Sequence, residues 1–329
     1  MNNNIVSKRS ELLFLYDIKD ANPNGDPTEE NKPRIDEETG QNIVTDVRLK
    51  RTIRDYLMNF KGYNGDTDKD KDIFIRKILD NEGNIQDAKM RANDFLGVKS
   101  ENFSEKLKNI KSNVLKKCID VRLFGATIPI EIDDKTSSIT LTGPVQFKMG
   151  RSLNKVELKY IKGTGAFASG KGQQQKTFRE DWVVNYSLIC FYGIINENTA
   201  KETQLTEDDI KLLLDGIWNG TKNLISRSKV GQMPRLLLKI NYKEQNYHIG
   251  DLDKLIKYNT EKDEEQIRDI SEITIDVTEL VNSLIAYKDK IESVEYKVDE
   301  RVKISKDGQE KTLDKILSEA ELPATPLLI

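Results

Sequence analysis

Three short apolar segments, each bounded by turn-forming residues, place the strongest limit on the fold of this chain. They cover residues 12–18, 181–193 and 236–240. Short apolar runs bounded in this way are typical of buried strands. Residues 138–147 alternate polar and apolar side chains and are rich in β-branched residues, which predicts a further strand.

Two amphipathic helices are predicted between these strands. The first begins at Thr45 or Asp46 and the second at Thr206, residues whose side chains can cap a helix N-terminus. The large elements then follow the order strand, helix, strand, strand, helix, strand. That order predicts an α+β fold of the ferredoxin-like or RNA-recognition-motif type, with insertions.

The first strand is followed at once by the sequence DANPNGDP, residues 20–27, which no regular element tolerates. We expect Asn22, Asn24 and Gly25 to supply positive φ angles, while the two prolines withhold N–H donors. The spacing imitates the start of an EF-hand loop, but its twelfth position is Asn31 instead of the required Glu. A shaped turn is therefore predicted, and a calcium loop is not.

Composition narrows the class of protein. The 329 residues are 33 % charged and 37 % hydrophobic, without an apolar run long enough for a membrane helix or a signal peptide, which predicts a cytoplasmic globular protein. Two cysteines, Cys118 and Cys190, are too few for a disulfide framework and predict buried free thiols. The single histidine, His248, has no motif around it, which argues against histidine-based catalysis.

Charge is distributed unevenly along the chain. Residues 146–179 hold eight basic residues and one acid, and residues 216–243 hold six basic residues and no acid. Residues 251–329 hold 20 acids and 12 bases. A polyanionic partner is therefore compatible with a net charge of −3, because binding depends on the local surface.

Two long segments interrupt the predicted core. Residues 61–117 are polar and lysine-rich and predict a mostly helical insertion. Residues 162–175 contain four glycines and few apolar residues, which predicts a long protruding loop. This segment lacks the G-x-x-x-x-G-K-[ST] pattern of a nucleotide-binding P-loop.

Several stretches resemble one known family. They are NPNGDP with PRID, TDVRLKRTIRDYL, DVRLFGA, TGPVQF followed by GRSLN, and WNGTKNLISRSKVGQMPRLLL, in this order between residues 12 and 240. Together they are similar to the Cas seven family, the CRISPR RNA-binding backbone subunits of type I Cascade complexes, and most like subtype I-B. Residues 251–329 match only loosely.

The resemblance implies a palm of the RNA-recognition type with a helical finger and a protruding thumb. We expect the palm at residues 1–60, 119–147 and 181–245, the finger at 61–118, the thumb at 148–180, and an acidic C-terminal region at 246–329 packed on the palm. The resemblance also implies a protein that is not an enzyme and needs no cofactor or metal. Its implied partners are CRISPR RNA, the target DNA strand, further copies of itself, and the repeat-end cap, large and small Cascade subunits, with no membrane partner.

Guide binding requires contacts to phosphate and ribose that leave base edges free. The expected RNA contacts come from four places: the opening loop, a basic ridge of the first helix, the basic thumb, and the basic loop before the last strand. The expected RNA-binding residues are Asn22, Asn24, Arg34, Lys50, Arg51, Arg54, Lys148, Arg151, Lys162, Phe167, Lys171, Arg227, Lys229, Gln232 and Arg235. Two alternatives stay open: a metal-dependent ribonuclease using Asp17, Asp26 or Asp36, and a sequence-specific RNA-binding module.

Overall fold

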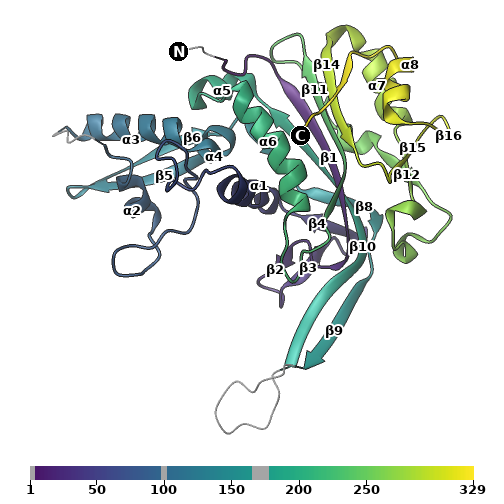
Figure 1. Ribbon diagram of the computed structural model, residues 1–329, viewed down its shortest axis with the longest axis horizontal. Helices are drawn as coiled ribbons and strands as arrows, with labels where there is room; N and C mark the ends of the chain where they lie inside the picture. The colour runs from purple at the N-terminus through teal and green to yellow at the C-terminus, as the bar shows by residue number, and fades with distance from the viewer. Residues whose placement is uncertain (1–3, 98–101, 165–177) are drawn as a thin grey trace.

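A large mixed sheet organises the protein, whose computed structural model describes residues 4–97, 102–164 and 178–329 (Figure 1). Its strands lie in the order β17-β14-β11-β1-β10-β8-β4-β3-β2, and β7 and β9 also pair with β10. The strands are β1 (Ser10–Ala21), β2 (Gly25–Asp26), β3 (Lys32–Ile35), β4 (Gln41–Val44), β7 (Val145–Phe147), β8 (Gly150–Lys155), β9 (Leu158–Thr164), β10 (Phe178–Ile195), β11 (Met233–Tyr242), β14 (Ile291–Val298) and β17 (Ala324–Pro326).

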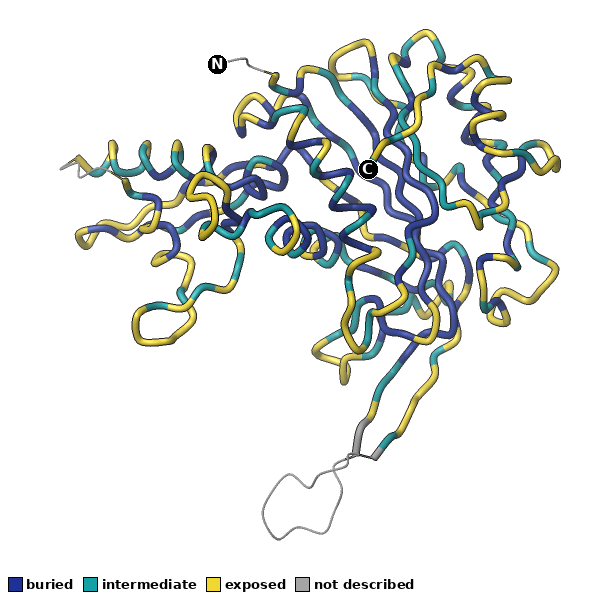
Figure 2. Tube along the Cα trace, viewed as in Figure 1, coloured by how far each residue is buried: buried dark blue, intermediate teal, exposed yellow. Residues whose placement is uncertain are grey.

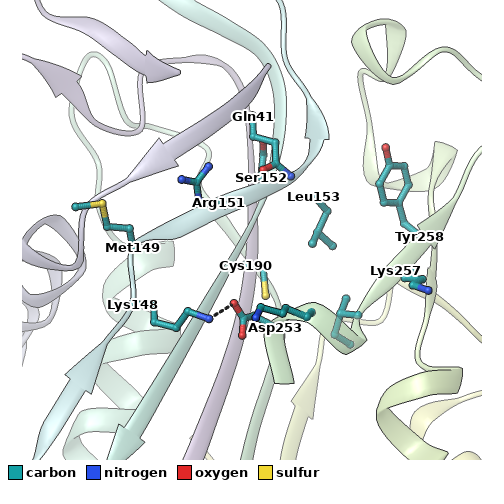
Figure 3. A pocket seen from close by; sticks show the side chains of 12 residues that line it. Gln41, Lys148, Met149, Arg151, Ser152, Leu153, Cys190, Asp253, Lys257 and Tyr258 are labelled. Atoms are coloured by element: carbon teal, nitrogen blue, oxygen red, sulfur yellow. Dashed lines mark hydrogen bonds and ion pairs between the residues drawn. The ribbon is translucent and has the colours of Figure 1, made fainter. Parts of the chain in front are cut away.

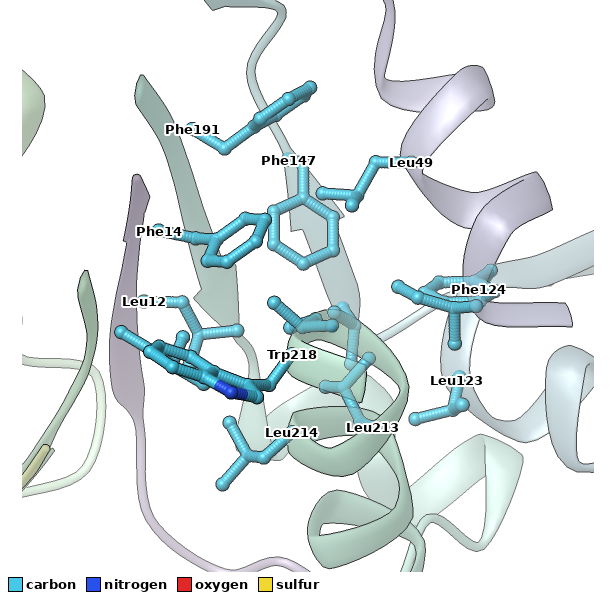
Figure 4. Close-up of a cluster of buried hydrophobic side chains, with 14 of the residues drawn as sticks. Leu12, Phe14, Leu49, Leu123, Phe124, Phe147, Phe191, Leu213, Leu214 and Trp218 are labelled. Atoms are coloured by element: carbon cyan, nitrogen blue, oxygen red, sulfur yellow. The ribbon is translucent and has the colours of Figure 1, made fainter. Parts of the chain in front are cut away.

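Both faces of the central strand β1 are buried, which explains the apolar run at residues 12–16. Leu12 and Phe14 pack on one face against α1 (Asp46–Phe60), α5 (Glu197–Thr203) and α6 (Glu207–Lys222) (Figure 4). Leu13 and Leu15 pack on the other face against the C-terminal part of the chain. Because successive side chains of a strand alternate between faces, a strand between two layers buries its side chains on both faces and is mostly apolar. Figure 2 shows this buried centre between the two covering layers.

The predicted N-caps of the two main helices are confirmed. The Thr45 hydroxyl accepts a hydrogen bond from the Arg48 N–H at 3.3 Å at the start of α1. At the start of α6, Thr206 and Asp209 exchange hydrogen bonds of 3.1 and 3.2 Å between side chain and backbone, which forms a capping box.

The insertion after α1 has its own small core. Its elements are α2 (Ala88–Asn93), α3 (Phe103–Lys117), α4 (Ile119–Phe124), β5 (Gly125–Ile132) and β6 (Lys135–Thr142). The buried carboxylate of Asp120 joins it to α1, accepting from Arg54 Nε at 2.9 Å and from the Phe74 N–H at 2.7 Å.

The single strand expected at residues 138–147 is wrong. Residues 135–142 form β6, which pairs with β5 in a separate hairpin, and only residues 145–147 pair with β10. The side chains of Ile139 and Leu141 pack in the core of the insertion. Their alternation correctly indicated a strand, but periodicity does not identify the sheet to which a strand belongs.

The thumb expected at residues 148–180 is largely strand in its described part. Of the protruding loop expected at residues 162–175, residues 162–164 are strand, and the rest lie outside the described residues. Residues 150–155 form β8 inside the large sheet, and residues 158–164 form β9, which pairs with the beginning of β10. The two-stranded ribbon of β9 and β10 extends away from the rest of the molecule (Figure 1).

The C-terminal part of the chain extends and covers the large sheet. Strand β14 pairs with β11, and a small sheet packs with α7 and α8 on the second face. Its further elements are η1 (Leu252–Leu255), β12 (Lys257–Asn259), η2 (Glu264–Gln266), η3 (Ile270–Glu272), β13 (Thr274–Asp276), α7 (Thr278–Ala286), η4 (Lys288–Lys290), β15 (Lys303–Lys306), β16 (Gln309–Glu310) and α8 (Leu313–Glu319).

A buried carboxylate fixes the connection into this C-terminal part. Glu11 on β1 accepts from the N–H groups of Ile249 and Gly250 at 2.9 and 2.8 Å. It also accepts from the hydroxyls of Tyr192 and Tyr242. Four donors therefore satisfy a carboxylate that is fully buried.

Both cysteines are buried free thiols, as predicted. Burial raises the pKa of each thiol, which disfavours the reactive thiolate. In the described part of the chain, no helix has both the length and the apolar character needed to cross a membrane.

Candidate nucleic-acid interface

Three segments distant in sequence meet at the end of β1: the loop 22–31, the N-terminus of α1 and the loop 223–232. The Asn22 N–H donates to the Ser228 carbonyl at 2.8 Å, and Lys229 Nζ donates to the Asn22 carbonyl at 3.0 Å. Asn24 Oδ1 accepts from both the N–H and the hydroxyl of Thr45 at 2.9 Å. The opening loop is therefore held between the helix and the second loop.

The side chains of this loop are used internally, contrary to the expectation that its amides are available to phosphates. Asn22 Nδ2 donates to the Asn31 carbonyl at 2.7 Å. Asn24 Oδ1 accepts from the hydroxyl of Thr45, which is the N-cap residue of α1. Asp26 forms an ion pair with Arg34. The loop thus positions its neighbours, while its amide donors serve the fold.

The expected positive φ angles at Asn22, Asn24 and Gly25 are also wrong. In this region the non-glycine residues with positive φ are Asp20, at 48°, and the pair Glu30 and Asn31, at 51° and 58°. Gly25 is required for space, because a Cβ there would lie 2.1 Å from Asn31 Oδ1 and 2.6 Å from the Asn31 carbonyl oxygen.

Two cations at this junction, Arg48 and Lys229, form no ion pair with a carboxylate among the described residues, although the charge of Asp55 acts on Arg48. We call them the Arg48–Lys229 pair. Burial, and to a smaller extent the nearby charge of Arg48, lower the pKa of Lys229 to about 8. Burial also lowers the pKa of Arg48. Two partly desolvated like charges repel each other, so an anion bound here would stabilise both charged forms.

Two buried hydrogen-bond donors on the same two segments as this pair are unused. Arg48 Nε and Gln232 Nε2 are buried and have no acceptor within the described residues. Another guanidinium nitrogen of Arg48 donates a hydrogen bond to the Thr52 hydroxyl, at 3.0 Å. Buried donors normally have acceptors, and an anion with several oxygens would supply them.

The solvated basic ridge expected on α1 is not present as predicted. Lys50 bonds Asp46 at 2.9 Å, and Arg51 bonds Asp55 at 2.7 Å. Arg54 is only 8 % exposed and lies under the insertion, where it pairs with Asp120. Helical periodicity revealed the apolar face of α1. It could not show that the insertion covers part of the opposite, basic face.

Arg235 is likewise a structural residue. It is buried between Asp17 and Asp299, with N–O distances of 2.9 Å to each carboxylate. Burial is the largest influence on Asp17 and raises the pKa of its carboxyl, although Arg235 and the Tyr186 hydroxyl oppose the shift. These two ion pairs join β1 and β11 to the turn after β14.

Lys148 and Arg151 lie away from this junction, around a groove of about 720 Å³ between β8 and the C-terminal part of the chain (Figure 3). Lys148 pairs with Asp253 at 2.8 Å, and Arg151 pairs with Asp36 at 2.7 Å. Met149 and Tyr258 contribute to the same groove. The structure therefore does not bring these two cations together with the Arg48–Lys229 pair.

The remaining predicted residues belong to the ribbon and its surroundings. Lys162 lies 3.7 Å from Glu180 across the ribbon, and exposed Arg227 pairs with Asp181 at 2.5 Å. Phe167 and Lys171 lie outside the described residues.

Arg48 was missed by sequence reasoning, although a signal was present. Lys50 has an acid four residues before it, and Arg51 has an acid four residues after it. Residues four apart on a helix are neighbours, so those two cations are expected to pair locally. Arg48 has Val44 and Thr52 at these positions and therefore has no local acid.

Comparison with known proteins identifies the family to which this chain belongs. The sequence model of the family described as CRISPR-associated protein Cas7 matches residues 8–278. A protein of Haloferax volcanii named CRISPR-associated protein Cas7 is 37 % identical over 313 residues, which cover 90 % of this chain and 88 % of that protein. This chain belongs to the Cas7 family, the Cas seven family of the sequence resemblance.

Solved structures offer a more distant likeness. One chain from a structure titled "CRISPR RNA-guided surveillance complex, pre-nicking" aligns with a TM-score of 0.48 and 11 % identity, covering 95 % of this chain and 99 % of that one. A chain from a second structure, titled "CRISPR RNA-guided surveillance complex", aligns with the same TM-score and identity. That alignment covers 95 % of this chain and 98 % of the other.

Proposed function

We propose that this protein is a non-catalytic RNA-binding backbone subunit of a CRISPR surveillance complex, with several copies stacking along one guide RNA. Membership of the Cas7 family supports the class of complex. The observation that carries RNA binding is the Arg48–Lys229 pair, two partly desolvated cations beside buried donors that lack acceptors. A phosphate has the charge and the oxygen atoms that this arrangement requires.

Strand topology supports a palm of the RNA-recognition type. Strands β11, β1, β10 and β8 are neighbours in that order and pair antiparallel. Helix α1 lies between β1 and β8 in the chain, and α6 lies between β10 and β11. This is the β-α-β-β-α-β connection of the ferredoxin-like fold. In our proposal the insertion is the finger, and the β9–β10 ribbon begins the thumb.

The acids considered for a ribonuclease favour the non-catalytic role. Asp17 is buried against Arg235, Asp26 pairs with Arg34, and Asp36 pairs with Arg151. Each of these carboxylates therefore stabilises an arginine, whereas metal-assisted hydrolysis requires carboxylates that converge on an open site.

We predict that the protein binds single-stranded RNA with little sequence preference and with a steep dependence on salt. If about six phosphates are neutralised, affinity should fall about 300-fold between roughly 50 and 200 mM salt, because counterions are released from single-stranded RNA on binding. Fluorescence anisotropy with labelled oligonucleotides of equal length and different sequence measures both properties. Strong preference for one sequence would instead support the sequence-specific module.

We also predict that RNA affinity decreases at alkaline pH. The pKa of Lys229 is about 8 in the free protein, and a phosphate favours its charged form. Binding above that pH therefore requires proton uptake, so affinity should fall about tenfold between about pH 7 and 9. Oligoadenylate is a suitable ligand, because its bases do not titrate in this range. The Lys229→Arg variant keeps its charge and should lose most of this dependence; an equal dependence in both proteins would show that another group titrates.

A further inference from the structure

Lys229 has the features of a reactive lysine as well as those of a phosphate ligand. Its side chain is half-buried, and its Nζ donates to the Asn22 carbonyl at 3.0 Å and lies 3.5 Å from the Ser228 hydroxyl. The charge that acts on this amine is that of Arg48. A lysine that is partly desolvated beside a second cation is activated as a nucleophile near neutral pH.

The reactive form of this amine is abundant near neutral pH. With a pKa of about 8, about a quarter of Lys229 is uncharged at about pH 7.5. An ordinary lysine, with a pKa of about 10.4, is uncharged to only about 0.1 % at that pH. The nucleophilic form of Lys229 is therefore about 200 times more abundant than that of an exposed lysine.

Carbon dioxide is the electrophile that suits this amine. It is small enough for a half-buried site, and it carries no charge that desolvation or the two cations would act on. The neutral nitrogen of Lys229 attacks the carbon of carbon dioxide, one C=O double bond becomes a C–O⁻ single bond, and the nitrogen releases a proton to solvent. The product is a carbamate, which carries one negative charge on two oxygen atoms.

Arg48 offers the partner that a carbamate requires. Its guanidinium is half-buried and forms no ion pair with a carboxylate in the described part of the chain. Its Nε is a buried donor without an acceptor among those same residues. A carboxylate-like group beside a guanidinium accepts charge-assisted hydrogen bonds, so carbamylation would replace a repulsion between like charges by an attraction.

We propose that Lys229 is a site of reversible carbamylation by carbon dioxide, and that the carbamate competes with RNA for the Arg48–Lys229 pair. The modification removes one of the two cations and puts a negative charge where a phosphate would bind. This inference rests on the proposed function and adds a form of regulation to it.

Chemical trapping locates the modification. The full chain is equilibrated with bicarbonate, which supplies carbon dioxide, and an oxonium alkylating agent then converts carbamates into stable esters for peptide mass spectrometry. We expect Lys229 to be modified at least about tenfold more than Lys222, an exposed lysine at the end of α6. Arg48→Ala should lower the modification of Lys229 about tenfold, because the carbamate loses a charge-assisted hydrogen bond.

RNA affinity measures the competition. Anisotropy titrations are compared in bicarbonate and in chloride of equal pH and ionic strength. If about two thirds of the protein is carbamylated, the apparent affinity should be about threefold lower in bicarbonate, because only the unmodified fraction binds. The Lys229→Arg variant should bind equally in both buffers, since its guanidinium stays protonated. The matched control Lys222→Arg should behave like the unsubstituted protein.

Modification of Lys229 no greater than that of Lys222 would overturn the carbamylation site. An equal loss of affinity in Lys229→Arg would do the same, because bicarbonate would then compete as a bound ion. Carbamylated Lys229 with unchanged RNA affinity would overturn the competition. Absence of RNA binding in chloride would overturn the proposed function, whereas a carbamate trapped at Lys229 would still establish the modification site.

Discussion

Replacing both Arg48 and Lys229 by Ala is expected to lower the affinity for single-stranded RNA by at least about a hundredfold. Each charge-assisted hydrogen bond contributes about 1.5–3 kcal/mol, so two together account for this loss. Thermal stability should change little, because the relief of repulsion between two partly buried cations offsets the loss of the Lys229–Asn22 and Arg48–Thr52 hydrogen bonds. Anisotropy titration and thermal unfolding measure the two effects separately.

The matched control is the double variant Lys50→Ala with Arg51→Ala. It removes the same number of positive charges as the Arg48 and Lys229 substitutions, but both of its cations already pair with acids of α1. We expect a much smaller loss of RNA affinity than at the Arg48–Lys229 pair. Equal losses in the two double variants would show that net charge, and not this pair, determines binding.

Replacing Asp120 by Ala is expected to destabilise the protein by about 3–5 kcal/mol, because it leaves Arg54 buried without its partner. The N–H groups of Phe74 and Ile75, 2.7 and 3.1 Å from the carboxylate, would lose their acceptor as well. Urea unfolding measures the change in the free energy of unfolding.

The control for this substitution is Asp55→Ala. It breaks the ion pair with Arg51, whose side chain is 57 % exposed, and exposed pairs contribute about 1 kcal/mol or less. A loss at Asp120 as small as the loss at Asp55 would contradict the assigned role of Arg54. It would also restore Arg54 as a candidate for RNA contact.

Much of the fold was predictable because its main elements leave strong local signals. The apolar runs that became β1, β10 and β11 and the caps at Thr45 and Thr206 depend on neighbouring residues alone. The partner of a strand depends on residues far away in the chain. Residues 138–147 show this difference, because they form strands in two different sheets.

The candidate site was less predictable for the same reason. A basic residue in the sequence does not reveal whether a distant acid neutralises it, as Asp120 does for Arg54 and Asp299 does for Arg235. Lys229 was predicted as an RNA-binding residue from the positive charge of its loop. Its partnership with Arg48 depends on three segments that meet only in the folded protein.

Nuclease footprinting of a long single-stranded RNA, saturated with the intact protein, tests the central claim most directly. A backbone subunit that stacks in copies and contacts phosphates should leave protected intervals of one constant length. These intervals should be the same on RNAs of unrelated sequence, and RNA incubated with the protein alone should remain at full length. One protected site fixed by sequence, or cleavage of the RNA by the protein itself, would contradict the account.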